Sequence, residues 1–375
     1  MKLFGWKSGR DDLRPGLSRV GTRTGATGMA VSGEWPASYE TQVRAGYQAN
    51  PVAQRAVKLV MEAVAGAPLE ECDPAVAALV QTRSGGQPLL ATIAAQLLLH
   101  GNAYVQLLRD EGGALSELYA LRPERVSVEA DAGGWPVGFA YRVGERVTRF
   151  HGEPVRPEVA HIRAFHPLDD HYGLGCLGAA AAAIGVHNAA AQWNRGLLDN
   201  AARPSGALVY EPGDGSTLTS EQFERLRGEM EAGFAGAGNA GRPMLLEGGL
   251  RWQALSLSPA EMDFAGLKAA AARDIALAFG VPPMLLGLPG DSTHANYKEA
   301  NRALWRLTVL PLADEILTSL SQAMDGWFEG VRLRVDLNRV PVLAEDRALL
   351  WRSVTAATFL SDDEKRTLVG VGPRS

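Results

Sequence analysis

The glycines between residues 173 and 178 come closest to a known cofactor-binding motif. Gly173, Gly175 and Gly178 match the pattern GxGxxG at the start of an expected helix. A dinucleotide site needs these glycines directly after a strand, with an acidic residue about 20 positions further on. Here the preceding strand is expected to end near Phe165, and the next acidic strand end, Glu211, lies 33 residues past Gly178. The spacing therefore favours a structural turn that opens a helix.

Metal-ligating side chains gather just before these glycines: His161, His166, Asp169, Asp170 and His171. Five-residue steps place successive histidines about 140° apart on a helix and on opposite faces of a strand. Pro167 also interrupts the run. We therefore expect structural or surface histidines and no metal site. A metal- or nucleotide-dependent enzyme that uses Gly173–Gly178 or this histidine cluster is kept as the alternative function.

Composition narrows the remaining classes of protein. The chain of 375 residues is 46% hydrophobic and 21% charged, which is typical of a folded protein with two or three domains. Its net charge of −5 disfavours tight binding of nucleic acid through the phosphates, although contact without tight binding is compatible with it. Cys72 and Cys176 are isolated, as in a reducing compartment. Neither a signal peptide nor a membrane-spanning helix is expected.

The elements that would position these residues fall into an α+β region followed by helices. Residues 1–33 are expected to be a flexible arm. Residues 50–65 read as a helix that Asn50 caps, and a second helix is expected at about 88–99. Strand patterns then follow: Ala103–Arg109, Glu117–Leu121, Val126–Glu129, Val137–Val143, Val147–Phe150 and Val159–Phe165.

Two alanine-rich helices, within 178–206 and 258–280, enclose a compact insert at 207–257. The insert is expected to contain strands and one helix, capped by Thr219 or Ser220 and ending near Phe234. Its strands are expected at Ala207–Glu211, Met244–Glu247 and Leu250–Leu257. Because alanine lets helices approach closely, the flanking pair suits a stalk packed among many neighbours.

The last third of the chain combines an apolar loop with a long helix. Met284, Leu285, Leu286 and Leu288 lie between two helices, where a loop would normally be polar, and we expect them to be exposed. A long helix is expected over 296–328, with a kink at Pro311 because proline cannot donate a helical hydrogen bond. Its Arg302 and Arg306 form an i,i+4 basic pair on a solvated or subunit-facing surface. A strand at Val331–Leu337 and helices at 344–357 and 361–369 are expected to follow.

Several ordered sequence blocks resemble the portal proteins of tailed bacteriophages of the long-tailed type and of gene transfer agents. They are Asn50–Leu69, Leu97–Tyr104 (LLLHGNAY), Ala160–Ala180, Asn200–Leu208 (NAARPSGAL), Gly238–Gly249 (GNAGRPMLLEGG), Arg273–Gly287 (RDIALAFGVPPMLLG), Asn296–Asn301, Leu307–Glu315 and Leu360–Pro373. The terminal block departs from the family's usual Thr-Asn-Glu-x-Arg but keeps a helix cap and charge. The blocks together cover the chain from about residue 45 onward.

The resemblance implies an α+β portal fold, with an α+β wing, a two-helix stem, a small α/β clip insert, a long kinked wing helix and a short helical crown. The implied parts are the arm 1–33, wing 34–177, first stem helix 178–206, clip 207–257, second stem helix 258–280, tunnel loop 281–295, long wing helix and strand 296–340, and crown 341–375.

The resemblance also implies a function without catalysis, metal or cofactor. Such chains form a ring, usually of twelve copies, at one capsid vertex. The ring conducts double-stranded DNA in a virion or phage-like particle assembled in the bacterial cytoplasm. Its partners would be the terminase large subunit, a head–tail adaptor protein and the major capsid protein, with no membrane. Twelve subunits at −5 each carry a formal charge of −60, which favours sliding of the duplex.

Site residues follow from the resemblance by position. The tunnel loop that faces DNA would present Pro283, Met284, Leu285, Leu286, Leu288 and His294. Lys268, Arg273 and Lys298 are possible channel-lining charges. Docking of the motor and the adaptor on the clip would involve Glu221, Glu224, Arg225 and Arg242.

Overall fold

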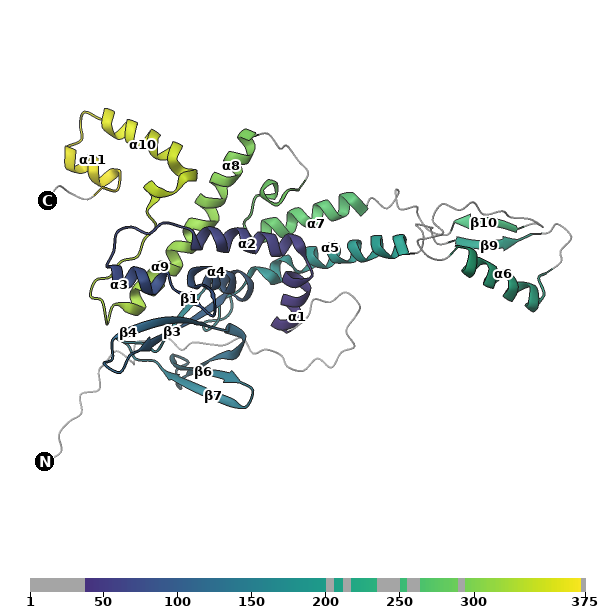
Figure 1. Ribbon diagram of the computed structural model, residues 1–375, viewed down its shortest axis with the longest axis horizontal. Helices are drawn as coiled ribbons and strands as arrows, with labels where there is room; N and C mark the ends of the chain where they lie inside the picture. Colours follow the sequence, from purple (N-terminus) through teal and green to yellow (C-terminus); the bar gives the residue numbers. More distant parts are fainter. Residues whose placement is uncertain are drawn as a thin grey trace. The chain divides into compact units, whose positions relative to one another are not determined.

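The computed structural model describes residues 38–199, 206–211, 217–234, 250–254, 264–288 and 294–371 (Figure 1). The chain divides into two compact units. The larger combines Met1–Ala181 with Ala276–Ser375, and the smaller is Ala182–Ile275. The arm expected at 1–33 lies outside the described residues. The α+β fold class expected from the sequence is confirmed.

Two helices predicted from their end signals form the centre of the larger unit. Helix α2 (Pro51–Ala65) begins at Asn50, whose Oδ1 accepts hydrogen bonds from the backbone N–H groups of Val52 and Ala53 at 3.1 and 3.0 Å. Helix α4 (Leu89–His100) ends at Gly101, which adopts a φ of +82°. The two helices pack against each other through apolar residues, so local capping and core burial agree.

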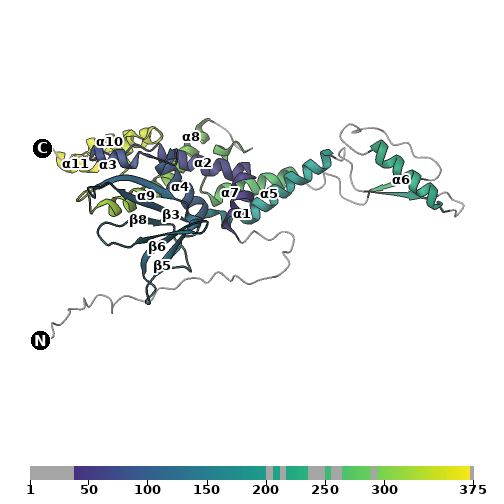
Figure 2. The same cartoon turned by 60° about the horizontal axis from the view of Figure 1, so that its bottom comes forward.

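Two antiparallel three-stranded sheets lie beside these helices (Figure 2). The first has the order β4 (Leu115–Leu121), β3 (Asn102–Arg109), β8 (Val159–Arg163). The second has the order β5 (Val126–Ala130), β6 (Pro136–Val143), β7 (Arg146–His151). All six strands were expected. Residues of both sheets form one buried cluster: Tyr104, Leu121, Val126, Phe150 and Val159.

Several short elements of the larger unit were not expected. They are α1 (Tyr39–Val43), the π-helical turn η2 (Arg44–Gln48), α3 (Pro74–Val80), and the two-residue strands β1 (Arg83–Ser84) and β2 (Gln87–Pro88). The expected strand Val331–Leu337 is wrong. Within the described residues the segment makes one isolated bridge, between Val335 and Leu69, and its backbone also pairs with Pro68 and Glu70.

The expected long helix is interrupted. It consists of α8 (His294–Leu304), a π-helical turn η6 (Trp305–Val309) and α9 (Leu310–Met324). The irregularity predicted at Pro311 therefore appears as a π turn directly before it. The sequence predicted that the helix ends at residue 328, but it ends at Met324. A Cβ on Gly326 would lie 2.1 Å from the Val155 carbonyl oxygen, so the chain passes too close to its neighbour there for a larger residue.

Two short helices close the described chain, as predicted. After the 3-10 turns η7 (Leu337–Arg339) and η8 (Pro341–Leu343), helix α10 spans Ala344–Ala356. Helix α11 (Asp362–Leu368) begins with a capping box, in which Ser361 and Glu364 each accept a hydrogen bond from the other's backbone N–H.

The smaller unit contains the insert and most of two helices. Strand β9 (Gly206–Tyr210) pairs antiparallel with β10 (Leu250–Ala254), and α6 (Ser220–Phe234) lies between them in sequence. Thr219 caps α6, since its Oγ1 accepts from the Gln222 N–H at 3.3 Å. Helices α5 (Cys176–Asp199) and α7 (Phe264–Ala278) run side by side in both views (Figures 1 and 2). The expected strand Met244–Glu247 lies outside the described residues.

Candidate functional site

The glycines of the GxGxxG match are used for close backbone packing. A Cβ on Gly173 would lie 2.0 Å from the Gly101 carbonyl oxygen, and one on Gly175 would lie 2.5 Å from that of Leu99. The Gly173 N–H, which a phosphate would need, already donates to Asn102 Oδ1 at 2.7 Å. The alternative nucleotide site therefore has no structural basis at these residues.

Two partly buried histidines, His161 and His100, hold the same turn in place. His161 Nε2 donates to Asn102 Oδ1 at 3.0 Å, and Asn102 Nδ2 donates to His100 Nδ1 at 3.1 Å and to the Gly173 carbonyl at 3.2 Å. The His161 ring also stacks on Tyr104 with 4.3 Å between ring centroids. Burial lowers the pKa of His161 to about 3 and that of His100 to about 4, so both rings are neutral at pH 7.

The other two histidines of the candidate metal site serve the turn itself. His166 Nδ1 accepts from the N–H groups of Leu168 and Asp169 at 3.0 and 2.8 Å. Asp169 Oδ1 accepts from the His171 N–H at 2.8 Å. Within the described part of the chain, no group of three or more His, Cys, Asp or Glu side chains could hold a metal ion. His161 and His166 thus use ring nitrogens for hydrogen bonds within the fold.

The apolar segment after α7 is fastened to the π turn of the long helix. Gly280 adopts a φ of +64°, and its carbonyl accepts a hydrogen bond from Thr308 Oγ1 at 2.6 Å. A Cβ on Gly280 would lie 2.7 Å from that oxygen. The Val281 N–H donates to the Ala276 carbonyl at 2.9 Å, and Phe279 and Val281 are buried. The turn therefore has a fixed geometry.

The next residues form a 3-10 turn, η5 (Pro283–Leu286), that contacts α2 and α8. The prediction that all four apolar residues of this loop are exposed is wrong, because Leu285 is only 9% exposed and the other three are also not exposed. A 3-10 turn of this kind directs one side chain inward, and Leu285 fills that position. Met284, Leu286 and Leu288 are half-buried. Residues 289–293 lie outside the described residues, and His294 begins α8.

The three candidate channel charges lie in different surroundings. Burial lowers the pKa of His187 on α5, and the charge of the half-buried Lys268 on α7 lowers it further. Arg273 on the same helix is exposed. Lys298 on α8 belongs to the larger unit, and its Nζ lies 3.8 Å from Glu345 Oε1 on α10. The structure thus pairs Lys298 with the C-terminal helices.

An ion-pair cluster around Arg302 joins α8 to α10, a contact that sequence reasoning missed. The Arg302 guanidinium lies 2.9 Å from Glu299, 2.7 Å from Glu345 and 3.6 Å from Asp346. Arg306 adds a contact of 3.9 Å to Asp346. Arg302 is only 16% exposed. The sequence contains the basic pair Arg302 and Arg306 and the acidic pair Glu345 and Asp346. No local pattern shows that the two pairs meet in the fold.

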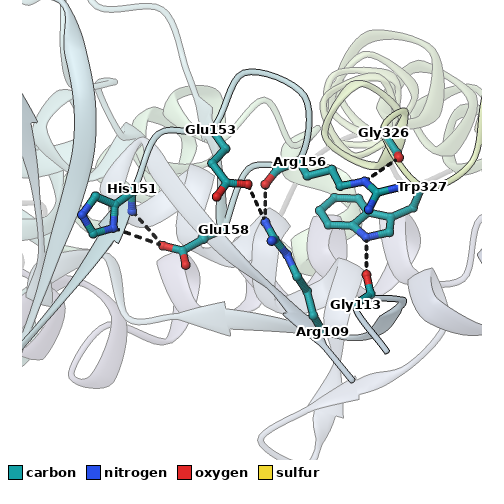
Figure 3. A network of polar contacts seen from close by, with 8 residues as sticks. All are labelled: Arg109, Gly113, His151, Glu153, Arg156, Glu158, Gly326 and Trp327. Atoms are coloured by element: carbon teal, nitrogen blue, oxygen red, sulfur yellow. Dashed lines mark hydrogen bonds and ion pairs between the residues drawn. The ribbon is translucent and has the colours of Figure 1, made fainter. Parts of the chain in front are cut away.

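A second missed cluster lies around Trp327 (Figure 3). The guanidinium groups of Arg109 and Arg156 lie 5.3 and 5.6 Å from the centre of its ring, and its Nε1 donates to the Gly113 carbonyl at 3.1 Å. Arg109 also pairs with Glu153 at 3.0 Å. The cluster ties the β3–β4 hairpin and the β7–β8 loop to the end of α9, so it supports the fold.

The candidate docking residues of the insert lie on α6. Glu221, Glu224 and Arg225 are exposed, and Glu224 forms an ion pair with Arg227 at 3.2 Å. Arg242 lies outside the described residues. Phe223 on the same helix is 55% exposed. The described part of the chain contains no helix that is both long and apolar enough to span a membrane.

The described fold combines an α+β unit, a pair of alanine-rich helices and an inserted β-α-β segment. This combination agrees with the family that the comparisons identify. Residues 51–370 match the family model described as phage portal protein, and the chain belongs to this family. A chain in the neck of a native gene transfer agent particle, computed with C12 symmetry, is 49% identical with a TM-score of 0.70, covering 91% of this chain and 95% of that one.

Two further relatives extend the comparison. An uncharacterized protein of Rickettsia felis is 42% identical over 294 residues, which are 77% of this chain and 74% of the relative. The crystal structure of a portal protein of the HK97 family from Corynebacterium diphtheriae is 19% identical, with a TM-score of 0.56, covering 82% of this chain and 99% of that one. At that identity the likeness concerns the fold alone.

Proposed function

We propose that this chain is the portal subunit of a gene transfer agent or phage particle. The observation that carries the proposal is its 49% identity, over 91% of its length, to a chain of a gene transfer agent neck. Twelve copies would form a ring at one capsid vertex, because that neck has C12 symmetry. The ring would conduct double-stranded DNA and take no part in catalysis.

The conduit role agrees with the charge of the chain. Duplex DNA carries about one negative charge per 1.7 Å of its axis, so a densely basic channel would hold it. A ring of twelve subunits at −5 each carries a formal −60. Charge of this sign favours passage over retention.

The burial pattern supports two different roles for the residues of the apolar loop. Leu285 anchors the loop against α2 and α8, while the half-buried Pro283, Met284, Leu286 and Leu288 approach the duplex together with His294. Lys268 and Arg273 on α7 add charge to the channel wall. Lys298 is assigned to the attachment of α10, because its Nζ lies 3.8 Å from Glu345 Oε1.

The insert at 207–257 is assigned to docking. Its helix α6 presents Glu221, Glu224 and Arg225 on an exposed surface, and Arg242 completes the proposed set. The terminase large subunit would bind there during packaging, and a head–tail adaptor protein would replace it. The major capsid protein would surround the larger unit.

Electron microscopy of the purified full chain tests the proposal. We expect rings of about twelve subunits with a central channel, and particles lacking the chain should contain no DNA. A monodisperse monomer, both at high protein concentration and in particle extracts, would overturn the portal assignment.

A further inference from the structure

A hollow of about 360 Å³ lies in the larger unit between the start of α3 and the loop that follows α9. The two segments that form it are joined nearby by the backbone bridge between Leu69 and Val335. The lining residues are Glu71, Cys72, Asp73 and Val76 from the first segment and Phe328, Glu329, Gly330, Val331 and Arg332 from the second. The bridge therefore holds the two walls of the hollow together.

Each wall also has a fixed local geometry. Asp73 caps α3, since its Oδ1 accepts a hydrogen bond at 2.8 Å from the backbone N–H two residues further on. On the opposite wall, the Val331 N–H donates to the Phe328 carbonyl at 3.2 Å, and the Gly330 N–H donates to Asp325 Oδ1 at 3.0 Å. A partner would meet a preformed surface, which lowers the entropic cost of binding.

Carboxylates dominate the edge of this hollow. Glu71, Asp73 and Glu329, which we call the acidic rim, are exposed, and Arg332 is the one basic residue that lines the hollow. Within the described part of the chain, no residue of the acidic rim forms an ion pair. The rim therefore suits a partner with positive charge.

The hollow also offers apolar contacts. Val76 is buried, and Phe328 and Val331 are half-buried. The two hollows beside α10 lack the acidic excess, because their charged lining residues are Asp362, Asp363, Lys365 and Arg366 in one and Arg306, Asp346 and Arg347 in the other. A short segment that combines basic and aromatic residues would thus match the hollow beside α3 best.

The start of the chain has this composition. Its first ten residues read MKLFGWKSGR, with three basic residues and no acidic one. Phe4 and Trp6 lie between Lys2 and Lys7. Residues 1–33 contain six basic and two acidic residues, although the whole chain has a net charge of −5. A basic segment with two aromatic residues therefore belongs to an otherwise acidic chain.

The intervening length of chain is sufficient for contact. From Trp6 to Tyr39, where α1 begins, there are 33 positions. Fully extended they span about 110 Å, whereas a compact unit of about 280 residues has a radius of gyration near 19 Å. A flexible tether gives an effective concentration on the order of 1 mM, so a contact with a dissociation constant of about 0.1 mM would be about 90% occupied.

We propose that the segment Lys2–Lys7 docks in the hollow beside α3 of its own chain. Trp6 packs against Phe328, and the two lysines face the acidic rim. The contact fastens the start of the chain to the larger unit and covers Cys72. It does not depend on the proposed function, because both partners belong to one chain.

The native thiol of Cys72, which lines the hollow and is partly exposed, allows a direct test in the full-length protein. Trp6→Cys is oxidised by dioxygen with copper phenanthroline, and mass spectrometry quantifies the disulfide between position 6 and Cys72. The matched control is Thr24→Cys, which is nearer to α1 and would meet the thiol more often if the segment did not dock. We expect about fivefold more product from position 6 than from position 24, or a larger excess.

Charge reversal shows whether the acidic rim is the cause. In the Trp6→Cys protein, Lys2→Glu with Lys7→Glu should reduce the yield to that of the control, and so should Glu71→Lys with Glu329→Lys. Combining both pairs should restore the yield. The pair at positions 2 and 7 leaves every described residue unchanged, so a loss of the fold does not explain its effect.

Equal yields from positions 6 and 24 would overturn the inference, and so would a disulfide that joins two chains. A basic segment can also bind nucleic acid. Equal yields, together with an affinity for duplex DNA that Lys2→Glu with Lys7→Glu lowers in filter binding, would assign the segment to DNA instead. A combined variant that cross-links no better than either pair would exclude the acidic rim as the partner.

Discussion

Gly280 and Gly287 both adopt left-handed conformations, φ +64° and +72°, but only Gly280 lies against another element. A Cβ at Gly280 would meet Thr308, whereas one at Gly287 would meet no atom of the described residues within 4 Å. We expect Gly287→Ala to lower the free energy of unfolding by about 1 kcal/mol, which is the backbone cost alone. Gly280→Ala should cost about 1–2 kcal/mol more. Urea titrations at one fixed protein concentration measure both, and equal losses would contradict the importance of the Thr308 contact.

The two histidines that contact Asn102, His161 and His100, predict a dependence of the free energy of unfolding on pH. The pKa values of His161 and His100 fall to about 3 and about 4 in the folded chain, against about 6.5 when unfolded. Above pH 6.5 both histidines are neutral in the folded and in the unfolded chain, so their titration does not reduce the free energy of unfolding. As the pH falls below 6.5, the unfolded state binds protons that the folded state excludes, so stability falls, by up to about 1.4 kcal/mol per pH unit for each histidine.

His161→Gln, which keeps a donor for Asn102, should reduce the slope of unfolding free energy between pH 6.5 and 4. The control is His151→Gln, at a side chain that is 82% exposed. An unchanged slope in the His161 variant would show that this ring accepts a proton without loss of the fold.

Gly173 shows what a residue pattern alone cannot decide. In sequence it is the first glycine of a cofactor motif. Its function depends on Gly101, 72 positions earlier, whose carbonyl leaves no room for a side chain. Nothing local encodes that approach. The histidine spacing was more informative, because five-residue steps prevent a shared face on either regular element.

At the scale of elements, the loop between α7 and α8 has an anchored and a less buried part. Leu285→Asp should destabilise the fold, since it places a carboxylate at a position that is only 9% exposed. Leu286→Asp with Leu288→Asp should instead leave rings intact and reduce the DNA content of particles. Electron microscopy of the rings and quantification of nuclease-protected DNA separate the two results. Normal DNA-filled particles from the double variant would refute a role of these residues in the channel.

Arg302 makes the shortest ion pair between α8 and α10, at 2.7 Å to Glu345, beside longer ones from Lys298 and Arg306. Arg302→Met keeps much of the aliphatic packing but removes the charge and leaves Glu345 and Asp346 without their closest cation. We expect faster amide hydrogen exchange in α10 and α11, with exchange in α2 and α4 unchanged. Arg251→Met, at an exposed pair with Glu211, is a control that should change neither region. Unaltered exchange in α10 would show that apolar packing alone holds the C-terminal helices.

Helix ends were predictable where a side chain marks them. Asn50 caps α2 and Thr219 caps α6 through N–H groups two or three residues further on. Local sequence is therefore sufficient to predict where these helices begin. The π turn at Trp305–Val309 was not predictable, although Pro311 indicated that the helix is irregular. The expected strand at Val331–Leu337 alternates correctly, but pairing depends on a distant partner, and only Leu69 and its neighbours are available.

For the whole molecule, the acidic balance predicts weak and nearly salt-independent contact with DNA. Each phosphate that a basic group neutralises adds about 0.9 to the slope of log affinity against log salt. A ring with a formal −60, from twelve subunits at −5 each, should show a slope near zero. Filter binding of duplex DNA to isolated rings between 50 and 200 mM salt measures it. A steep decline of DNA affinity with rising salt would show that basic groups outnumber acidic groups along the channel.

The Arg302 cluster also limits how this family can change over generations. A single mutation that neutralises Glu345 or Asp346 leaves a mostly buried cation with fewer partners, and the loss recurs in every copy of a symmetric assembly. Inheritable changes at residues 302, 306, 345 and 346 should therefore occur together. Among related chains these four positions should co-vary, which would identify attachments of the C-terminal helices to α8 from sequence alone, even where the helices themselves have diverged.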